Sequence, residues 1–257
     1  MIKIFYKEIL NEKVVFKAAF SQKLPLLLKG PTGCGKSRFV EAMAQEYDRP
    51  MVTVSCNDET SATDLLGRYL IKGGETVWQD GPVTRAVREG SILYLDEIAE
   101  AREDVITVLH ALSDHRRELH IDRLDETLKA GDNFMLVISF NPGYQQSLKE
   151  MKPSTRQRFI SLAFDYPEPS VELEILMTES ALEEKYCKKL VQIADKIRSL
   201  NELGLVETVS TRLLISSAKL IKEGLPPRLA CEVGIVQTLT DDHEVATTLK
   251  DIVNLII

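Results

Sequence analysis

The segment "GPTGCGKS" (Gly30–Ser37) has the residue types and spacing of a phosphate-binding loop, G-x-x-x-x-G-K-[ST]. Its glycines let backbone N–H groups turn inward onto phosphate oxygens. Lys36 can reach the β- and γ-phosphates, and the Ser37 hydroxyl can coordinate Mg²⁺. An apolar strand precedes the segment and a helical pattern follows it, which disfavours a glycine-rich turn without function. We expect ATP and Mg²⁺ as ligands, with the nucleotide contacted by Gly30, Pro31, Thr32, Gly33, Cys34, Gly35, Lys36, Ser37 and Arg38.

The segment "ILYLDE" (Ile92–Glu97) is an apolar strand that ends in two acids. Alone, it reads equally well as a strand ending in solvated carboxylates. Paired with the phosphate loop, it predicts that Asp96 shares Mg²⁺ with Ser37, through water. Glu97 is then placed to polarise the attacking water as a general base. The two segments together predict Mg²⁺-dependent ATP hydrolysis.

A third apolar strand, "VISFNPG" (137–143), ends in Asn141. In a parallel sheet this strand end lies on the same edge as the phosphate loop. We therefore expect Asn141 to orient the water or to contact the γ-phosphate. The alternative is an Asn-Pro pair that only starts a turn.

The segment "STRQRF" (Ser154–Phe159) places Arg156 and Arg158 just before a short apolar run. Two arginines so close need anionic partners. From the residues alone, salt bridges within the chain and contact with a phosphate both remain open.

Five apolar, strand-like runs must position these residues. Helical patterns separate most of them, one starting near Phe39 and another at Val105–Leu112. Strand–helix alternation predicts an α/β core with a parallel five-stranded sheet and helices on both faces. Two stretches around polar turns, about 66–82 and 117–130, read as hairpin insertions. The runs are 24–29, 51–56, 91–97, 133–141 and 161–164.

The pattern changes after "YPEPS" (166–170), where two prolines mark a boundary. Helical spacing dominates beyond this point, and no strong strand is evident. We expect a nucleotide-binding core over residues 1–167 and a small all-helical lid domain over residues 168–257.

Composition restricts the function classes. The net charge is −7, with 39 acidic and 32 basic residues, so the general field does not favour nucleic acid. The four cysteines are scattered, as in proteins with reduced thiols. The first ten residues are too short and too charged for a signal peptide. No apolar run approaches the ~18 residues that a membrane helix needs. We expect a cytoplasmic protein without membrane insertion.

Taken together, these motifs resemble the AAA+ ATPases, and more closely the MoxR branch and its CbbQ/NirQ/NorQ subfamily. The similarity runs from about Leu24 to Asp242. It rests on the phosphate loop and strand-end acids and on further strings of the sequence, which include "DLLGRYL", "WQDGPVTRAVREG", "DHRREL", "FNPGYQ", "KPSTRQRF", "FDYP" and "STRLLISSAKLI".

The resemblance implies a homo-oligomeric ring, usually a hexamer, with ATP at subunit interfaces. It places the arginine finger at Arg158, which would reach a neighbour's γ-phosphate, while Arg156 assists it or pairs with an interface acid. Arg212, in "STR" (Ser210–Arg212), matches the sensor that reports the nucleotide to the lid. The hairpin insertions match family hairpins that face the pore or a partner. Trp78, in the first hairpin, belongs either to that surface or to the core.

The resemblance also implies a chaperone-like motor that works with a von Willebrand factor A domain protein on a client enzyme. The leading expectation is a CbbQ-type Rubisco activase subunit, and the alternative is a NorQ/NirQ-type activator of nitric oxide reductase. No residue separates the two. Three other classes fit less well. A nucleotide kinase needs neither a base such as Glu97 nor an arginine that acts across an interface, and the net charge of −7 disfavours a DNA-stimulated ATPase. The intact Glu97 counts against a nucleotide-gated scaffold without useful hydrolysis.

Overall fold

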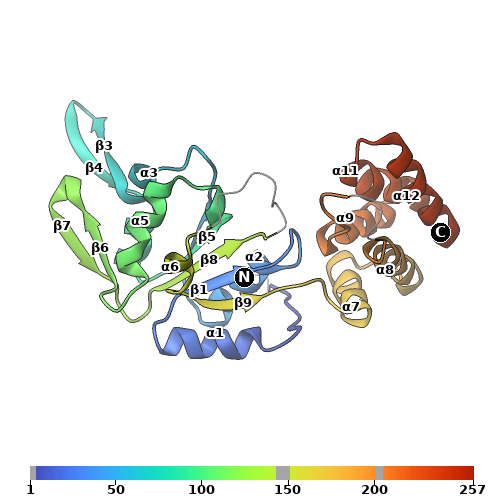
Figure 1. The fold of residues 1–257 in the computed structure, drawn as a ribbon, viewed down its shortest axis with the longest axis horizontal. Helices are drawn as coiled ribbons and strands as arrows, with labels where there is room; N and C mark the ends of the chain where they lie inside the picture. Colours follow the sequence, from blue (N-terminus) through green and yellow to red (C-terminus); the bar gives the residue numbers. More distant parts are fainter. Residues whose placement is uncertain (1–3, 143–150, 201–204) are drawn as a thin grey trace. The chain divides into compact units, whose positions relative to one another are not determined.

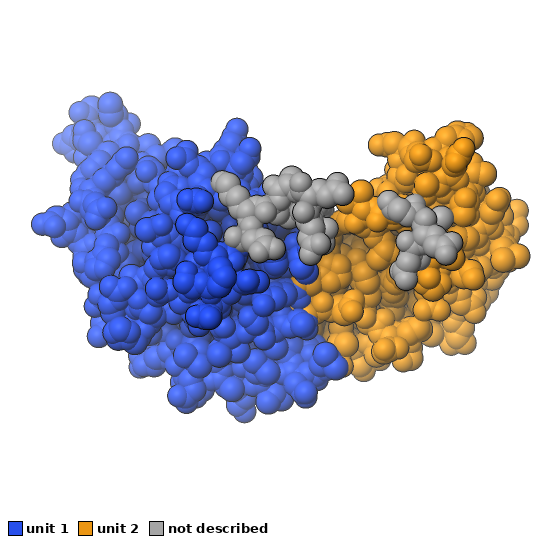
Figure 2. Space-filling view, viewed as in Figure 1, with its two compact units in different colours: residues 1–4, 10–29, 37–163 blue, residues 5–9, 30–36, 164–257 orange. Residues whose placement is uncertain are grey.

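The computed structural model describes residues 4–142, 151–200 and 205–257. The chain forms two compact units, shown in blue and orange in Figure 2. The first comprises residues 1–4, 10–29 and 37–163, and the second comprises residues 5–9, 30–36 and 164–257. The division expected from the sequence, 1–167 and 168–257, did not separate the two short segments 5–9 and 30–36 from the core. Both contact the helical part of the chain and therefore group with it.

The first unit is built on a parallel five-stranded sheet, as predicted (Figure 1). The strand order is β2-β5-β8-β1-β9, so the two strands that carry the candidate acids and Asn141 are neighbours. Leu95 of β5 pairs with Ile138 of β8, and Ile138 pairs in turn with Leu27 of β1. The strands are β1 (Leu26–Lys29), β2 (Met51–Ser55), β5 (Ile92–Asp96), β8 (Met135–Phe140) and β9 (Ile160–Ala163).

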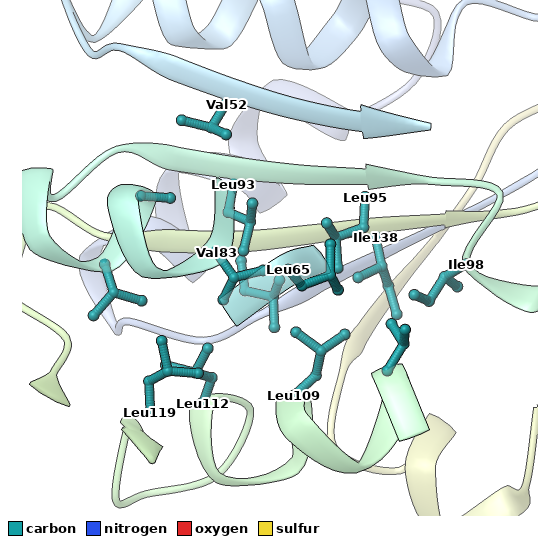
Figure 3. Packing of buried hydrophobic residues seen from close by; sticks show 14 of the residues in the cluster. Val52, Leu65, Val83, Leu93, Leu95, Ile98, Leu109, Leu112, Leu119 and Ile138 are labelled. Carbon is teal, nitrogen blue, oxygen red and sulfur yellow. The ribbon is translucent and has the colours of Figure 1, made fainter. Parts of the chain in front are cut away.

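Both faces of this sheet are covered, which explains why its strands read as continuous apolar runs. Leu93 and Leu95 face one side, where they join the core cluster formed with Leu65, Val83 and Leu109 (Figure 3). The helices on that side are α3 (Ala62–Leu66), α4 (Pro82–Glu89) and α5 (Glu103–Leu112), and those of the opposite layer are α1 (Glu12–Ser21) and α2 (Lys36–Glu46).

Aromatic side chains join the two helices of the opposite layer. The rings of Phe16 in α1 and Phe39 in α2 meet edge to face at 5.7 Å, and both side chains are fully buried. This contact fixes α2, whose first turn continues the phosphate loop.

Two antiparallel hairpins extend from the first unit and lie side by side (Figure 1). The hydroxyl of Tyr69 donates to the carbonyl of Arg123 across them, at 3.1 Å. Trp78 is half-buried: its ring packs against Tyr69 and the adjoining core, and Nε1 donates to Asp80 at 2.7 Å. The hairpins are formed by β3 (Gly67–Lys72) with β4 (Glu75–Asp80) and by β6 (Glu118–Ile121) with β7 (Glu126–Lys129); the short helices η1 (Ile98–Glu100), η2 (Asp122–Leu124) and α6 (Pro153–Arg156) complete the unit.

The remainder of the second unit is helical, and none of its described residues lies in a strand. Apolar side chains from three long helices pack together in its core, among them Leu176 of α7, Leu190 of α8 and Leu214 of α9. Within the described ranges, no helix is both long and apolar enough to span a bilayer. The helices are α7 (Pro169–Ser180), α8 (Glu184–Arg198), α9 (Thr211–Lys222), α10 (Pro227–Cys231), η4 (Glu232–Val236), α11 (Gln237–Leu239) and α12 (His243–Ile256).

Candidate active site

The phosphate loop, residues 30–36, connects β1 to α2. Lys36 is the first residue of α2, and its side chain is buried within the loop. Nζ donates to the carbonyl oxygens of Gly30 at 2.7 Å and Pro31 at 2.8 Å. The loop backbone therefore surrounds a cation, beside the N-terminus of α2, and the partial positive charge of a helix N-terminus favours anions.

Two glycines of this loop allow neighbouring atoms to approach so closely that a side chain would have no room. A Cβ on Gly30 would lie 2.4 Å from the carbonyl oxygen of Phe164. Gly33 has φ +71°, and a Cβ there would lie 2.7 Å from Ser210. All of these residues belong to the second unit, in which the backbone of Phe164 and the side chain of Ser210 lie directly against the loop.

The start of α9 lies against the same loop. Ser210 caps the helix by accepting the N–H of Leu213, at 3.3 Å. Arg212 follows in the first turn and is exposed, with its Cβ 3.2 Å from where a Cβ of Gly33 would stand. The structure thus places Arg212 next to the phosphate loop, and its sensor role stays a prediction.

The acidic end of β5 lies in the first unit together with Ser37. The Ser37 hydroxyl is 3.3 Å from Asp96 Oδ2 and 3.2 Å from the Tyr94 hydroxyl. The Tyr94 hydroxyl donates to Asp96 Oδ1 at 2.8 Å, and Ser139 Oγ donates to the same oxygen. Burial raises the pKa of Tyr94, so its hydroxyl keeps its proton and remains a donor.

Glu97 follows in a left-handed conformation, with φ 54°, and its side chain is exposed. Its N–H donates to Ser139 Oγ at 2.9 Å, which fixes the backbone just after the strand. Asn141 Nδ2 donates to Glu97 Oε1 at 3.3 Å. The structure therefore brings Asn141 to the candidate base, where its amide orients the carboxylate. Contact of Asn141 with water or the γ-phosphate stays a prediction.

The donor set suits Mg²⁺. Ser37 and Asp96 present a hydroxyl and a carboxylate oxygen 3.3 Å apart, and Mg²⁺ prefers such hard oxygen ligands. Among the residues that the structure describes, no cluster of three or more His, Cys, Asp or Glu side chains is placed to hold a metal alone.

Tyr94 and Ser139 were absent from the sequence-based site, although each left a signal. Tyr94 precedes Asp96 by two residues, so both side chains point to the same face of β5. Ser139 is the polar residue in the otherwise apolar segment Met135–Phe140 and is fully buried. A buried polar side chain requires a partner, and the neighbouring strand β5 supplies it.

Arg156 and Arg158 lie around the end of α6, within the first unit. Arg158 Nη1 is 3.3 Å from Asp114 Oδ2 and 3.4 Å from the carbonyl oxygen of His110. Asp114 is also bound by Arg116, with a shortest distance of 2.6 Å, and this contact holds the pKa of its carboxyl well below its usual value. Arg156 is exposed. Arg158 thus has an intrachain acid within reach, and finger action by either arginine stays a prediction.

The thiol of Cys34, inside the phosphate loop, is poorly suited to chemistry. Burial raises the pKa of Cys34, which outweighs the opposing effect of the nearby Lys36 ammonium. A protonated thiol is a poor nucleophile. The other three cysteines are also buried and free, at positions 56, 187 and 231.

The fold and this site define a P-loop ATPase of the AAA class. A family model described as "AAA domain (dynein-related subfamily)" matches residues 25–159, and the protein is an ATP-hydrolysing enzyme. Solved structures show the same fold: a mutant of RuvB from Thermotoga maritima has a TM-score of 0.58 at 16% identity, covering 96% of this chain and 71% of that one. A putative ATPase from Cytophaga hutchinsonii has a TM-score of 0.53 at 15% identity, covering 97% and 90%.

Within that class, the chain belongs to the CbbQ/NirQ/NorQ family. The model of the "CbbQ/NirQ/NorQ C-terminal" region matches residues 172–256. Protein NorQ of Paracoccus denitrificans is 55% identical, covering 96% of this chain and 92% of the relative. Denitrification regulatory protein NirQ of Pseudomonas aeruginosa is 52% identical, covering 98% and 96%. Protein CbbQ of Hydrogenophilus thermoluteolus is 47% identical, covering 96% and 92%. The resemblance inferred from the motifs is confirmed. Part of the string "FNPGYQ" falls in 143–150 and lies outside the described residues.

Proposed function

We propose that this chain is the motor of a chaperone-like machine that uses Mg²⁺-dependent ATP hydrolysis to activate a client enzyme. The observation that carries the hydrolytic part is the geometry at the ends of β5 and β8. Asp96 lies within 3.3 Å of the Ser37 hydroxyl, and Glu97 is held by the Asn141 amide at 3.3 Å. A metal-ligand pair and a candidate base thus occupy adjacent residues.

Each residue has a distinct task in this proposal. Lys36 and the loop amides bind the β- and γ-phosphates, and Ser37 and Asp96 hold Mg²⁺, which neutralises phosphate charge when bound. Glu97 takes a proton from the attacking water. Asn141 keeps the Glu97 carboxylate in place, and Arg212 contacts the nucleotide from the start of α9.

We propose further that the chains assemble into a ring, in which Arg158 acts on the nucleotide of a neighbouring subunit. The contact with Asp114, at 3.3 Å, then holds Arg158 in a defined place before it engages. Support comes from its partly exposed side chain, with 34% of its surface accessible, and from the family to which the chain belongs. An arginine that engages a phosphate in trans stabilises charge in the transition state.

For the client, the comparisons favour the denitrification side over the Rubisco side. NorQ and NirQ relatives reach 55% and 52% identity, against 47% for the CbbQ relative. We therefore propose a role in the activation of nitric oxide reductase, together with a von Willebrand factor A domain partner. Rubisco activation is the second candidate, because the CbbQ relative also matches over 96% of the chain.

The test is reconstitution in cells that express the nitric oxide reductase genes and the partner. Nitric oxide reduction should require the wild-type chain and should be lost with Lys36→Ala, whose loop no longer holds the phosphates. Lys219→Ala, at an exposed position of α9, is the matched control and should support activity. Full reductase activity without the chain would contradict the proposal. ATP-dependent reactivation of inhibited Rubisco by the purified proteins would establish the second candidate instead.

A further inference from the structure

A half-buried tyrosine of the second unit, Tyr166, contacts the phosphate loop directly. Its hydroxyl donates to the carbonyl oxygen of Thr32 at 3.1 Å. Burial raises the pKa of Tyr166, so the hydroxyl keeps its proton and remains a donor. The hydrogen bond therefore joins one side-chain donor to one backbone carbonyl of the loop.

This carbonyl belongs to the same peptide unit as the N–H of Gly33. The peptide is planar and trans, because the described chain has no cis bonds, so the N–H points away from the carbonyl. A donor that fixes the Thr32 carbonyl therefore also fixes the direction of the Gly33 N–H. Gly33, with φ +71°, lies where the loop presents its amides to phosphate oxygens.

The ring of Tyr166 is in turn held by Arg198 at the end of α8. The guanidinium carbon lies 4.3 Å from the ring centroid, and Nε donates to the carbonyl oxygen of Val209 at 2.8 Å. The two terminal nitrogens bind both carboxylate oxygens of Glu172, each at 2.8 Å. A planar guanidinium that is bound by a carboxylate and a carbonyl has little freedom to rotate. The Tyr166 ring therefore packs against a group that is held in place.

Glu172 links this support to the start of α9. It is fully buried, and it also accepts the hydroxyl of Thr211 at 2.6 Å. Thr211 is the first residue of α9 and directly precedes Arg212. One buried carboxylate therefore anchors both the arginine under Tyr166 and the helix start that carries the candidate sensor.

A second contact reaches the loop from the segment before α9. The hydroxyl of Thr32 donates to Glu207 Oε1 at 2.6 Å. Thr32 is thus bound through its carbonyl by Tyr166 and through its side chain by Glu207. The loop position of this residue is determined by the second unit on two sides.

We propose that Tyr166, supported by the Arg198–Glu172 ion pair, is a positioning residue for ATP binding that holds the Thr32–Gly33 peptide with its N–H directed at the phosphates. The inference rests on the proposed binding of ATP by this loop. Since Tyr166 orients a binding group and touches no reacting atom, its loss changes affinity for nucleotide and leaves the chemical step intact.

The test removes only the hydroxyl, in Tyr166→Phe. The dissociation constant for a non-hydrolysable ATP analogue and the KM for ATP should each rise about three- to tenfold, the usual effect of one hydrogen bond. The kcat should stay within about twofold, and the urea midpoint should match wild type. Tyr186→Phe, on α8 of the same unit, is the matched control and should leave all four values unchanged. Wild-type affinity in Tyr166→Phe would overturn the inference.

A second variant tests the support behind the ring. Arg198→Lys keeps the charge and loses the planar fork. It should weaken analogue binding in the wild-type background, with little further effect in Tyr166→Phe, because both changes release the same peptide. Fully additive losses would overturn the link between the two residues. Should wild type itself fail to bind ATP, the proposed function fails; if wild type binds and Tyr166→Phe binds equally well, only this inference fails.

Discussion

At the scale of single residues, Ser139 links the two acidic residues of the candidate site. Its hydroxyl donates to Asp96, and it accepts the backbone N–H of Glu97 at 2.9 Å. One buried hydroxyl therefore positions both the carboxylate that we propose as a metal ligand and the backbone of the candidate base. Such groups, which orient the ligands themselves, influence metal sites strongly.

We expect Ser139→Ala to lower kcat by about 10- to 100-fold, since hydrogen bonds to a charged group contribute about 1.5–3 kcal/mol. The Mg²⁺ concentration for half-maximal activity should rise, because Asp96 loses a donor that fixes its orientation. Steady-state hydrolysis across a Mg²⁺ series measures both effects. Ser161→Ala, at an exposed position of β9, is the control. A Ser139→Ala enzyme indistinguishable from this control would show that the hydroxyl has no such role.

Sequence patterns predict the residues whose chemistry is carried by a motif, and they miss those whose role depends on a neighbouring strand. Lys36, Ser37, Asp96 and Glu97 follow from local spacing. Ser139 does not, because its partners lie 42 and 43 positions away and only the pairing of β5 with β8 brings them together. The contact of Arg158 with Asp114 likewise depends on the packing of α6 against α5.

At the scale of elements, the buried ion pair between α7 and α8 organises the helical unit. Glu172 has 1% of its side chain accessible and Arg198 has 17%. Removing one partner from a buried pair leaves the other charge without compensation, which typically costs about 3–5 kcal/mol. Thr211 of α9 shares the same carboxylate, so three helices depend on it.

We therefore expect Glu172→Gln to lower the free energy of unfolding of the helical unit by about 3 kcal/mol. Glu174→Gln is the matched control on the same helix. Its carboxylate binds Lys7 at 2.8 Å with about half of its surface exposed, and such pairs contribute at most about 1 kcal/mol. Urea denaturation of the three proteins gives the comparison. An equal decrease in the free energy of unfolding in the two variants would mean that the buried pair contributes no more to stability than the exposed one.

The five strands and the helical character of the second unit were predictable, because buried parallel strands and amphipathic helices leave periodic patterns. The helices α3 and α4 were not predicted, since short helices give few turns of periodicity. The grouping of residues 30–36 with the helical unit was also beyond the pattern. It arises from the close approach of Gly30 to Phe164 and of Gly33 to Ser210, each more than 130 positions away.

At the scale of the whole molecule, a ring with shared sites predicts complementation between inactive subunits. Arg158→Ala and Glu97→Gln should each be nearly inactive as homogeneous proteins, since an arginine finger contributes about 10³–10⁵ in rate. In a mixture, some interfaces combine an intact Glu97 from one subunit with an intact Arg158 from its neighbour. For random equal mixing, about a quarter of interfaces are repaired, so hydrolysis should return to a readily measured fraction of wild type.

Co-assembly is established by pull-down of differently tagged subunits, and Arg156→Ala in place of Arg158→Ala separates the two arginines. Only an arginine that acts in trans complements. Mixed rings that form and stay inactive would contradict the shared site. A second test is the rate of hydrolysis per subunit as the protein is diluted. If this rate stays constant down to a concentration at which the protein is shown to be monomeric, the shared site is also contradicted.

The most direct test of the central claim is ATP turnover by Glu97→Gln, measured beside its nucleotide affinity. The substitution keeps the shape of the side chain and leaves Ser37 and Asp96 in place, so Mg²⁺-ATP should bind with wild-type affinity. Removal of the base should lower kcat by about 10²–10⁴-fold. Turnover at the wild-type rate, with binding unchanged, would show that Glu97 is not the base and that hydrolysis is organised around a different group.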